Sequence, residues 1–267
     1  MEDSIFKVEK KGHIAWMILN NPHKRNAMSF SFYDGLKTHF NEIDKDSDIY
    51  VVIIKAEGKS FTTGTDLDEF EGICKLIKPN NRESILLKLL QAQQGINSIE
   101  ECRKPVIAAV HSHCLGAGVD LLCACDVRLA TENAVFSIRE VRMGFIADVG
   151  TIQRLPHIIE DGYVRELVFT GRDFNAAEAH RMGFITRICK DQEELYAEAE
   201  KLADQIASCA PLAVQGSKEA IIFSRDKGIR AGLKYVARKN ADMCPSEDMM
   251  EAFTAFREKR LPIFKGE

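Results

Sequence analysis

Apolar and polar residues alternate in two short segments near the N-terminus, with the period of a β-strand. The segments span residues 5–9 and 13–19 and flank the turn Lys10-Lys11-Gly12. This arrangement predicts a β-hairpin. Apolar side chains occupy both alternating sets of positions in the second segment, so we expect that strand to be buried on both faces.

Farther along the chain, apolar positions recur with the period of a helix. After Ser29 they follow at Phe32, Leu36, Phe40 and Ile43, and a similar pattern covers residues 81–103. Short runs rich in Val, Ile and Ala, expected to be buried strands, fall between these helical patterns at residues 50–54, 106–110 and 127–130. Alternating strands and helices with such strands predict an α/β fold with a parallel sheet.

After Val149 the pattern becomes almost wholly helical. Asn175 with Glu178 three residues later has the form of a helix N-terminus, and helical patterns follow over residues 191–209 and 212–223. We therefore expect an α/β core over residues 1–200 and a C-terminal helical region over residues 201–267. Residues 79–82 are the best candidate for a mobile surface loop.

Composition narrows the function classes. The 267 residues are 45% hydrophobic and carry a net charge of -4 with both signs interspersed, which argues against a nucleic-acid-binding surface. No apolar run approaches the roughly 20 residues that span a bilayer, and no targeting peptide is visible. The eight cysteines lie mostly in apolar runs, so free thiols in a reducing compartment, the cytoplasm, are expected.

Two turns containing glycine follow predicted strands. One is Phe61-Thr62-Thr63-Gly64-Thr65-Asp66-Leu67 and the other is His113-Cys114-Leu115-Gly116-Ala117-Gly118-Val119-Asp120. Small residues between a strand and a helix leave backbone N–H groups uncovered, where they can bind an anion or a developing oxyanion. A dinucleotide fingerprint would require a third glycine where Leu121 stands, so that interpretation fails. Close packing of a helix on a strand is the structural alternative.

Three carboxylates stand in informative contexts. Asp120 lies in an apolar helix start, where it is either a functional acid or a residue that the helix dipole favours. Glu140 lies between Arg139 and Arg142, and a surface salt bridge is its alternative role. Asp148 precedes a predicted helix start, so an ordinary N-cap is its alternative role.

Four segments together resemble the crotonase, or enoyl-CoA hydratase/isomerase, family. Residues 61–67 resemble the family pattern F-x-x-G-x-D-[LI], and residues 108–121 resemble A-x-x-x-G-x-x-x-G-G-G-x-[ED]-L. Residues 20–28 resemble N-[RN]-P-x-x-x-N-A-[LM], and residues 255–266 resemble the family's C-terminal tail. The resemblance covers residues 13–266 in order. It implies a crotonase-like ββα superhelix core with a C-terminal helical trimerisation region, as a homotrimer or homohexamer.

The resemblance also implies an acyl-CoA thioester as substrate. The backbone N–H groups of Thr65 and Ala117 would hold the thioester oxygen, although Ala117 and Ser112 stand where many members have glycine. The residues implied in binding coenzyme A and the substrate are Lys24, Arg25, Asn26, Ala27, Gly64, Asp66, Leu67 and Gly116. For Lys24 and Arg25, simple solvated charge is an open alternative.

The family places its two catalytic acids twenty residues apart, as Asp120 and Glu140 are here. A third acid at Asp148, with Asp at the first position, is similar to the dienoyl-CoA isomerase subgroup. Moving a 3,5-diene to a 2,4-diene takes a proton from C2 and delivers one to C6, which two acids can do. We assign Glu140 to C2 and Asp148 to C6, with the reverse assignment open, and Asp120 to tuning them. Sharing one apolar cavity should keep at least one acid protonated near neutral pH.

Two other functions stay open at this stage. An enoyl-CoA hydratase would use Asp120 and Glu140 to place water, and a non-catalytic acyl-CoA-binding protein would keep only the fold. No cofactor is expected, because coenzyme A is part of the substrate. His111 and His113 lack the further ligands that a metal site requires. No covalent nucleophile stands out, since Ser112 and Cys114 lack the nucleophile-elbow pattern.

Overall fold

The computed structural model describes residues 5–76 and 82–267. Its centre is a six-stranded sheet in the order β1-β2-β3-β4-β6-β9, parallel except for the antiparallel β1-β2 pair. The strands of this sheet are β1 (Phe6–Lys11), β2 (Ile14–Leu19), β3 (Val51–Ala56), β4 (Val106–Val110), β6 (Val127–Thr131) and β9 (Arg187–Cys189). The predicted α/β class and N-terminal hairpin are confirmed.

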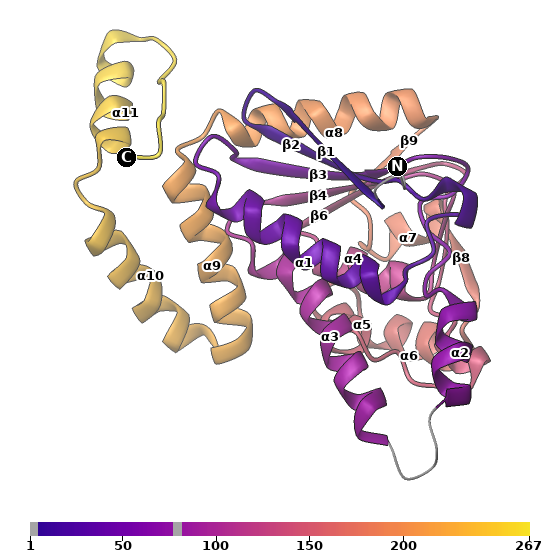
Figure 1. Ribbon diagram of the computed structural model, residues 1–267. Coiled ribbons are helices and arrows are strands. Elements are labelled where there is room, and N and C mark those ends of the chain that lie inside the picture. Colours follow the sequence, from indigo (N-terminus) through magenta and orange to yellow (C-terminus); the bar gives the residue numbers. More distant parts are fainter. Residues whose placement is uncertain (1–4, 77–81) are drawn as a thin grey trace.

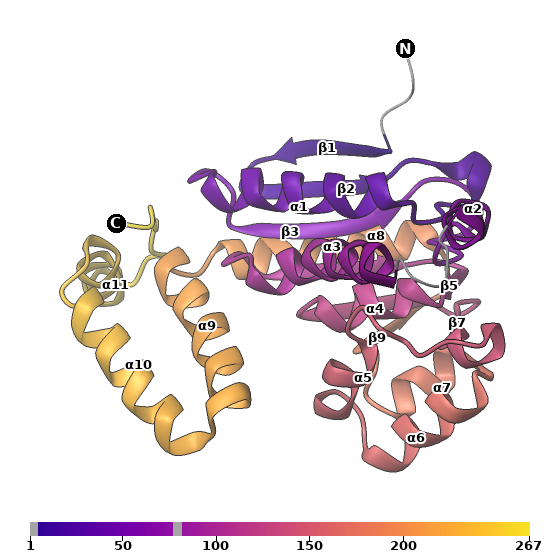
Figure 2. The same ribbon diagram turned by 60° about the horizontal axis from the view of Figure 1, so that its bottom comes forward.

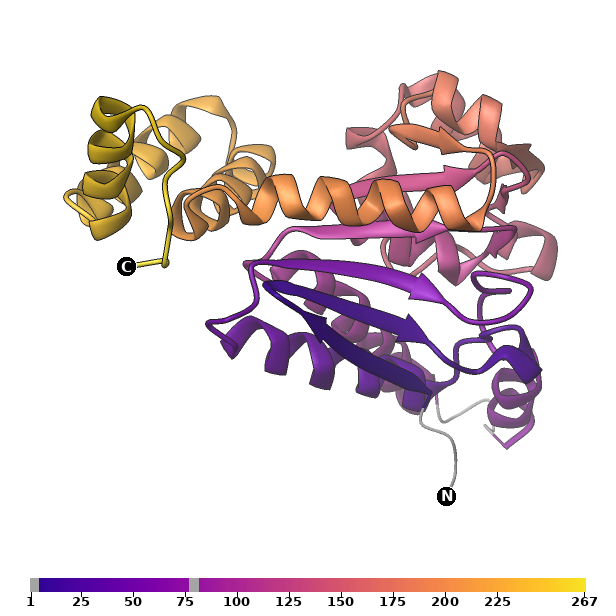
Figure 3. The same cartoon turned by 90° about the horizontal axis from the view of Figure 1, so that it is seen from above.

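The sheet lies between two layers of helices (Figure 1). On one face pack α1 (Phe30–Lys45), α3 (Arg82–Glu101) and α4 (Ala117–Ala124), whose apolar side chains form the larger core. The long helix α8 (Gln192–Ala207) crosses the other face, as Figure 3 shows from above. All six residues of β2 are buried, as expected for a strand covered on both sides.

Local signals explain where two of these helices start. The hydroxyl of Ser29 accepts a hydrogen bond from the Phe32 amide at 3.2 Å, and Asp191 caps α8 in the same way. On α8, Leu195, Ala199 and Ala203 repeat every four residues and are fully buried against the sheet. Small side chains on this stripe let the helix approach the strands closely.

A second, three-stranded sheet lies beside α4, which contacts its strand β5. It contains β5 (His113–Leu115) and β7 (Val135–Ser137), which are parallel, and β8 (Asp173–Asn175), which is antiparallel to β7. The remaining helices before α8 are short. They are η1 (Pro22–Lys24), α2 (Leu67–Leu76), η2 (Glu140–Met143), α5 (Thr151–Arg154), η3 (Leu155–His157), α6 (Asp161–Thr170) and α7 (Ala176–Arg181).

The C-terminal helices form an arm that projects from the body of the molecule (Figure 2). They are α9 (Pro211–Lys227), α10 (Ile229–Met243) and α11 (Glu247–Glu258). The helical nature of this region was predicted. The expected boundary at residue 200 falls inside α8, which packs on the sheet, and the division into two domains stays a prediction.

One expectation needs correction, and one helix was missed. The chain after Val149 is not wholly helical, because β8 and β9 lie there and β9 pairs with β6 in the central sheet. Each has three residues, too few for a period of two to emerge from the sequence. Helix α2 was also not expected. The loop proposed at residues 79–82 falls mainly outside the described residues.

Candidate active site

The three carboxylates that sequence analysis singled out meet in one region. Asp120 comes from the first turn of α4, Glu140 opens η2, and Asp148 lies in the loop before α5. Glu140 and Asp148 line the same narrow cavity, of about 30 Å³. Asp120 is fully buried and interacts electrostatically with both of them. None of the three points freely into solvent.

Asp120 is held by the start of the next helix. Its Oδ1 accepts a hydrogen bond of 2.5 Å from the Thr151 amide, whereas its Oδ2 has no partner among the described residues. Burial and the nearby Glu140 carboxylate raise the pKa of Asp120 to about 8. This carboxyl therefore keeps a proton near neutral pH, as expected for one member of the group.

Glu140 is buried, with 6% of its surface exposed, and its Oε2 has no partner among the described residues. Burial and, to a lesser degree, Asp148 raise its pKa. The alternative of a surface salt bridge is wrong, because Arg139 pairs with Asp173 and Arg142 bonds the Thr170 carbonyl.

Asp148 is half-buried, and burial raises its pKa. The N-cap of α5 is Gly150, two residues later, so the alternative that Asp148 is an ordinary N-cap is wrong. Gln93 of α3 donates a hydrogen bond of 2.6 Å to the Asp148 carbonyl oxygen. This contact fixes the backbone of the loop that presents the carboxyl to the cavity.

The two glycine turns lie against each other. A Cβ on Gly64 would stand 2.5 Å from the Leu115 carbonyl oxygen and 3.3 Å from the Ala117 nitrogen, and the φ of Gly64 is +84°. Only glycine accepts both constraints. Two isolated β-bridges fix the first turn in place. One joins Thr65 to Met28 in the segment after η1, and the other joins Thr62 to Cys114 of β5.

Thr65 and Ala117 both line the acid cavity. Ala117 is the first residue of α4, where an amide has no partner inside its own helix. The Met28–Thr65 bridge uses the amides of Met28 and Asp66, not that of Thr65. In the part of the chain that the structure describes, neither amide donates a backbone hydrogen bond, so both can donate to an oxygen in the cavity.

Glu140 lies close to Gly116, the residue before Ala117. A Cβ on Gly116 would lie 3.6 Å from its Oε1. The carboxylate is therefore next to the turn that leads into Ala117. Such a cavity, with two uncovered amides and acids at different positions, can stabilise an enolate and move protons along it.

The remaining predicted binding residues differ in their exposure and in their contacts. Lys24 forms an ion pair of 2.7 Å with Asp66, while Arg25 is exposed with a φ of +52°. Asn26 is buried and braces its own loop, with its side-chain amide donating to the carbonyls of Glu57 and Ser60. Gly64 and Gly116 shape the turns, Ala27 is partly buried, and Leu67 is exposed at the start of α2.

Among residues 5–76 and 82–267, no three His, Cys, Asp or Glu side chains gather in a way that could hold a metal ion. Within the same ranges, none of the helices has the length and apolarity to cross a bilayer. All eight cysteines are free thiols.

Comparison with known proteins decides the family. The model of the enoyl-CoA hydratase/isomerase family matches residues 9–267. The chain belongs to that family. The predicted crotonase fold is thereby confirmed, as is the chain's nature as an enzyme that acts on acyl-CoA.

Members of this crotonase family resemble the chain along nearly its whole length. The mitochondrial Delta(3,5)-Delta(2,4)-dienoyl-CoA isomerase of Mus musculus is 40% identical over 97% of this chain and 80% of the mouse protein. The peroxisomal isomerase of the same name from Arabidopsis thaliana is 38% identical over 93% of this chain and 91% of its own. The crystal structure of enoyl-CoA hydratase from Bacillus anthracis has a TM-score of 0.92 at 30% identity, covering 99% and 100% of the two chains.

Sequence analysis missed the apolar and aromatic part of this crotonase cavity. Its wall includes Phe30, Tyr33, Phe70, Leu89, Phe145 and Val149. The rings of Phe70 and Phe145 lie 5.7 Å apart, between α2 and the loop after η2. Tyr33 stands one position off the apolar stripe of α1, and that offset with a polar tip was the available signal. Burial and the carboxyl groups around it raise the pKa of Tyr33, so its hydroxyl stays protonated.

Proposed function

We propose that the chain is an acyl-CoA isomerase that converts a 3,5-dienoyl-CoA to the 2,4-dienoyl-CoA in fatty acid β-oxidation. One observation carries this proposal: Glu140 and Asp148 line a single cavity with Thr65 and Ala117. The mouse and Arabidopsis relatives, both Delta(3,5)-Delta(2,4)-dienoyl-CoA isomerases, support the choice of reaction. The substrate is an acyl-CoA thioester, and no separate cofactor takes part.

The reaction begins at the thioester. The amides of Thr65 and Ala117 donate hydrogen bonds to its carbonyl oxygen, which acquires negative charge when C2 loses a proton. Fixed donors aimed at that charge typically lower the barrier by several kcal/mol. Glu140 takes the C2 proton, since its carboxylate lies beside the turn that leads into Ala117 and C2 is bonded to the thioester carbon.

Asp148 then delivers a proton at C6. It lies in the loop between η2 and α5, and it shares the cavity wall with Leu89, Phe145 and Val149. Burial keeps its pKa raised, which favours the protonated form that an acid requires. A single carboxyl group would have to reach both ends of the conjugated system, and two acids remove that requirement.

Asp120 acts on the pair without lining the cavity. Its neutral form near pH 7 avoids a second negative charge beside the ionised Glu140 while Asp148 carries its proton. Through the Thr151 amide it also fixes the start of α5, and therefore the loop that carries Asp148. We infer a tuning and positioning role for Asp120.

Coenzyme A binds on the side of η1 and the first glycine turn. Lys24 and Arg25 supply positive charge for its phosphates, and the exposed position of Arg25 leaves it available. Lys24 already forms an ion pair with Asp66. Its ammonium group must therefore contact the Asp66 carboxylate and a phosphate of coenzyme A at the same time. Asn26, Ala27, Leu67 and Gly116 hold or shape the walls that face the substrate.

Absorbance measurements test the proposal directly. A 3,5-dienoyl-CoA mixed with the protein should gain absorbance as its double bonds come into conjugation with the thioester. A 2-enoyl-CoA should lose absorbance only if the protein adds water to it. No change with dienes of several chain lengths, together with loss from the enoyl substrate, would establish a hydratase and reject the isomerase.

The hydratase alternative has its own support in the fold match to the Bacillus anthracis enzyme. Replacement of Asp148 separates the two activities. We expect Asp148→Gly to lower the isomerisation rate by about 10²–10⁴ because C6 loses its acid, while any hydration by Glu140 and Asp120 persists. Asp148→Asn is the matched control for side-chain volume, and equal loss of both activities would contradict the division of roles.

A third possibility, an acyl-CoA-binding protein without catalysis, predicts thermal stabilisation by acyl-CoA with no turnover of any thioester. The presence of both uncovered amides and the acids speaks for catalysis. We further propose a homotrimer or homohexamer in the cytoplasm. The free cysteines suit a reducing compartment, although the mouse and Arabidopsis relatives are named mitochondrial and peroxisomal.

A further inference from the structure

A second cavity adjoins the acid cavity at Asp148. Its volume is about 350 Å³, enough for several water molecules. Asp148 and Val149 belong to the walls of both cavities. These two consecutive residues therefore form the partition between the apolar acid cavity and the second one, which we call the rear cavity.

The rear cavity is polar and its wall is fixed by ion pairs. Glu100 of α3 accepts hydrogen bonds from Arg154 of α5 at 3.2 Å and from Arg225 of α9 at 2.6 Å. Arg154 also donates to Asn97 at 2.7 Å. Three helices that are far apart in the sequence are thus joined around the rear cavity, whose wall includes Asp148.

Glu100, the carboxyl group that these two arginines hold, does not act as a proton donor in this cavity. Burial raises the pKa of Glu100, but the hydrogen bonds from Arg225 and Arg154 outweigh it and leave the pKa below its ordinary value. Glu100 therefore stays ionised. Gln93, on the same wall, holds the Asp148 carbonyl oxygen and so keeps the carboxyl at the partition.

The isomerisation leaves a proton imbalance inside the site. The C2–H bond breaks, its proton passes to Glu140, and its electron pair forms the enolate. When the enolate collapses, the C5=C6 pair takes the proton of Asp148 to form a C6–H bond. The substrate keeps its atoms, but Glu140 has gained a proton and Asp148 has lost one, so both must be reset.

We propose that the rear cavity supplies Asp148 with a proton from water after each turnover. This inference rests on the isomerase function proposed above. Glu140 gives its proton to water on the substrate side, and Asp148 takes one through the rear cavity, so the two transfers balance. The alternative is internal return, in which the proton of Glu140 passes back to Asp148 and the atom removed from C2 reappears at C6.

Isotope labelling distinguishes these routes. The wild-type protein is mixed with 3,5-dienoyl-CoA in D₂O, and the product is examined by mass spectrometry and NMR. Reprotonation from water predicts one deuterium at C6 in each product molecule. A product formed at the normal rate without deuterium at C6 would overturn the inference and leave the isomerase function intact.

A variant that narrows the rear cavity gives the second measurement. Gln153 is exposed on α5 and lines this cavity, and no catalytic role is assigned to it. We expect Gln153→Trp to lower kcat several-fold with KM unchanged and to reduce deuterium at C6, whereas Gln153→Ala matches the wild type. Unchanged kcat and labelling in a folded Gln153→Trp protein would contradict the route. Absence of any diene conversion by the wild type would reject the isomerase function itself, and this inference with it.

Discussion

At the residue scale, Asp120 links the site to the stability of the fold. A carboxyl group whose pKa rises from 3.8 to about 8 on folding binds more protons in the folded than in the unfolded state between these values. The stabilisation it provides is complete below about pH 4 and is lost as pH rises toward 8. The slope cannot exceed about 1.4 kcal/mol per pH unit.

Replacement by its isostere tests this linkage. Asp120→Asn can still accept the hydrogen bond from the Thr151 amide but does not titrate. We expect its free energy of unfolding, measured with urea between pH 5 and pH 8, to fall less steeply with pH than that of the wild type. Parallel pH profiles for the two proteins would show that Asp120 titrates normally.

Gln93 is a residue whose role only the structure makes visible. Its side chain fixes the Asp148 carbonyl oxygen, although the two are 55 residues apart. We expect Gln93→Leu to lower kcat for the diene by several-fold with little change in KM, because Asp148 then samples unproductive positions. Gln94→Leu, on the exposed side of the same helix, is the control, and equal effects of both changes would rule out a specific contact.

The acids themselves could be found from the sequence, because their spacing and flanking residues match a family pattern. Gln93 could not, and Tyr33 gave only the signal of a polar tip one position off the apolar stripe of α1. Each lies on a helix whose apolar periodicity already explains its neighbours, and each acts through a contact with a distant loop. Only the packing of α1 and α3 over the cavity brings these side chains to it.

At the scale of elements, the site depends on two turns that touch. The close approach of Gly64 to the Leu115–Ala117 backbone leaves no room for a side chain. We expect Gly64→Ala to lower kcat by about 100-fold or more by displacing the oxyanion donors. Gly72→Ala on α2, where a Cβ would meet nothing within 4 Å, should keep wild-type activity. Comparable losses in both variants would mean that the turn contact is unimportant.

Sequence periodicity predicted the long helices and strands, but it did not predict the short ones. The helix after Ser29 and the strands β2, β3 and β4 were predicted because several residues repeat the same pattern. Strands β5, β7, β8 and β9 have three residues each, so they depend on neighbours supplied by distant parts of the chain. The second sheet, which carries the glycine turn before α4, is therefore a product of tertiary structure.

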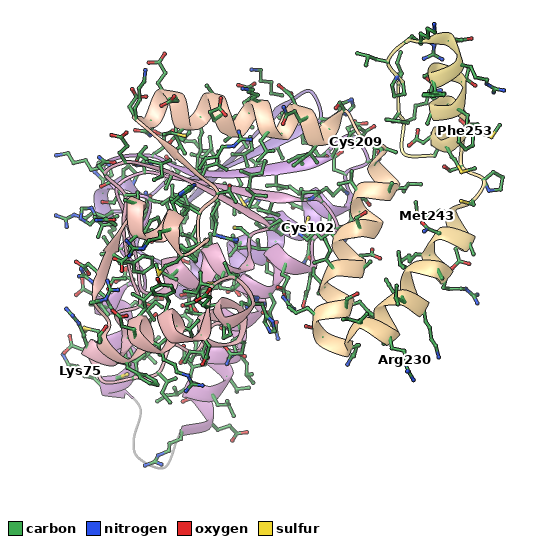
Figure 4. All side chains as sticks on the ribbon, turned by 180° about the vertical axis from the view of Figure 1, so that it is seen from behind. Lys75, Cys102, Cys209, Arg230, Met243 and Phe253 are labelled. Carbon is green, nitrogen blue, oxygen red and sulfur yellow. The ribbon has the colours of Figure 1, made fainter. Side chains whose placement is uncertain are left out.

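At the scale of the whole molecule, the arm of α9, α10 and α11 carries apolar side chains that none of the residues described by the structure covers. Phe256 is 85% exposed, and Ile229, Leu233 and Phe253 are also exposed. Figure 4 labels Arg230, Met243 and Phe253 along this arm, away from the main body. Exposed apolar side chains of this extent are typical of surfaces that bind another protein chain.

Association through the arm can be measured in solution. We expect light scattering to give a mass of about 90 kDa or its double, three or six times the 30.0 kDa of one chain. Phe256→Asp should shift the protein toward smaller species, whereas Lys7→Asp on the distant strand β1 should not. A wild-type mass of 30.0 kDa at micromolar concentration would contradict the proposed trimer or hexamer.

A crystal structure with a bound 2,4-dienoyl-CoA would test this arrangement of amides and acids. We expect the thioester oxygen to lie within hydrogen-bond distance of the Thr65 and Ala117 amides, with Glu140 beside C2 and Asp148 beside C6. A thioester bound away from these amides, or a C6 atom beyond the reach of Asp148, would contradict it.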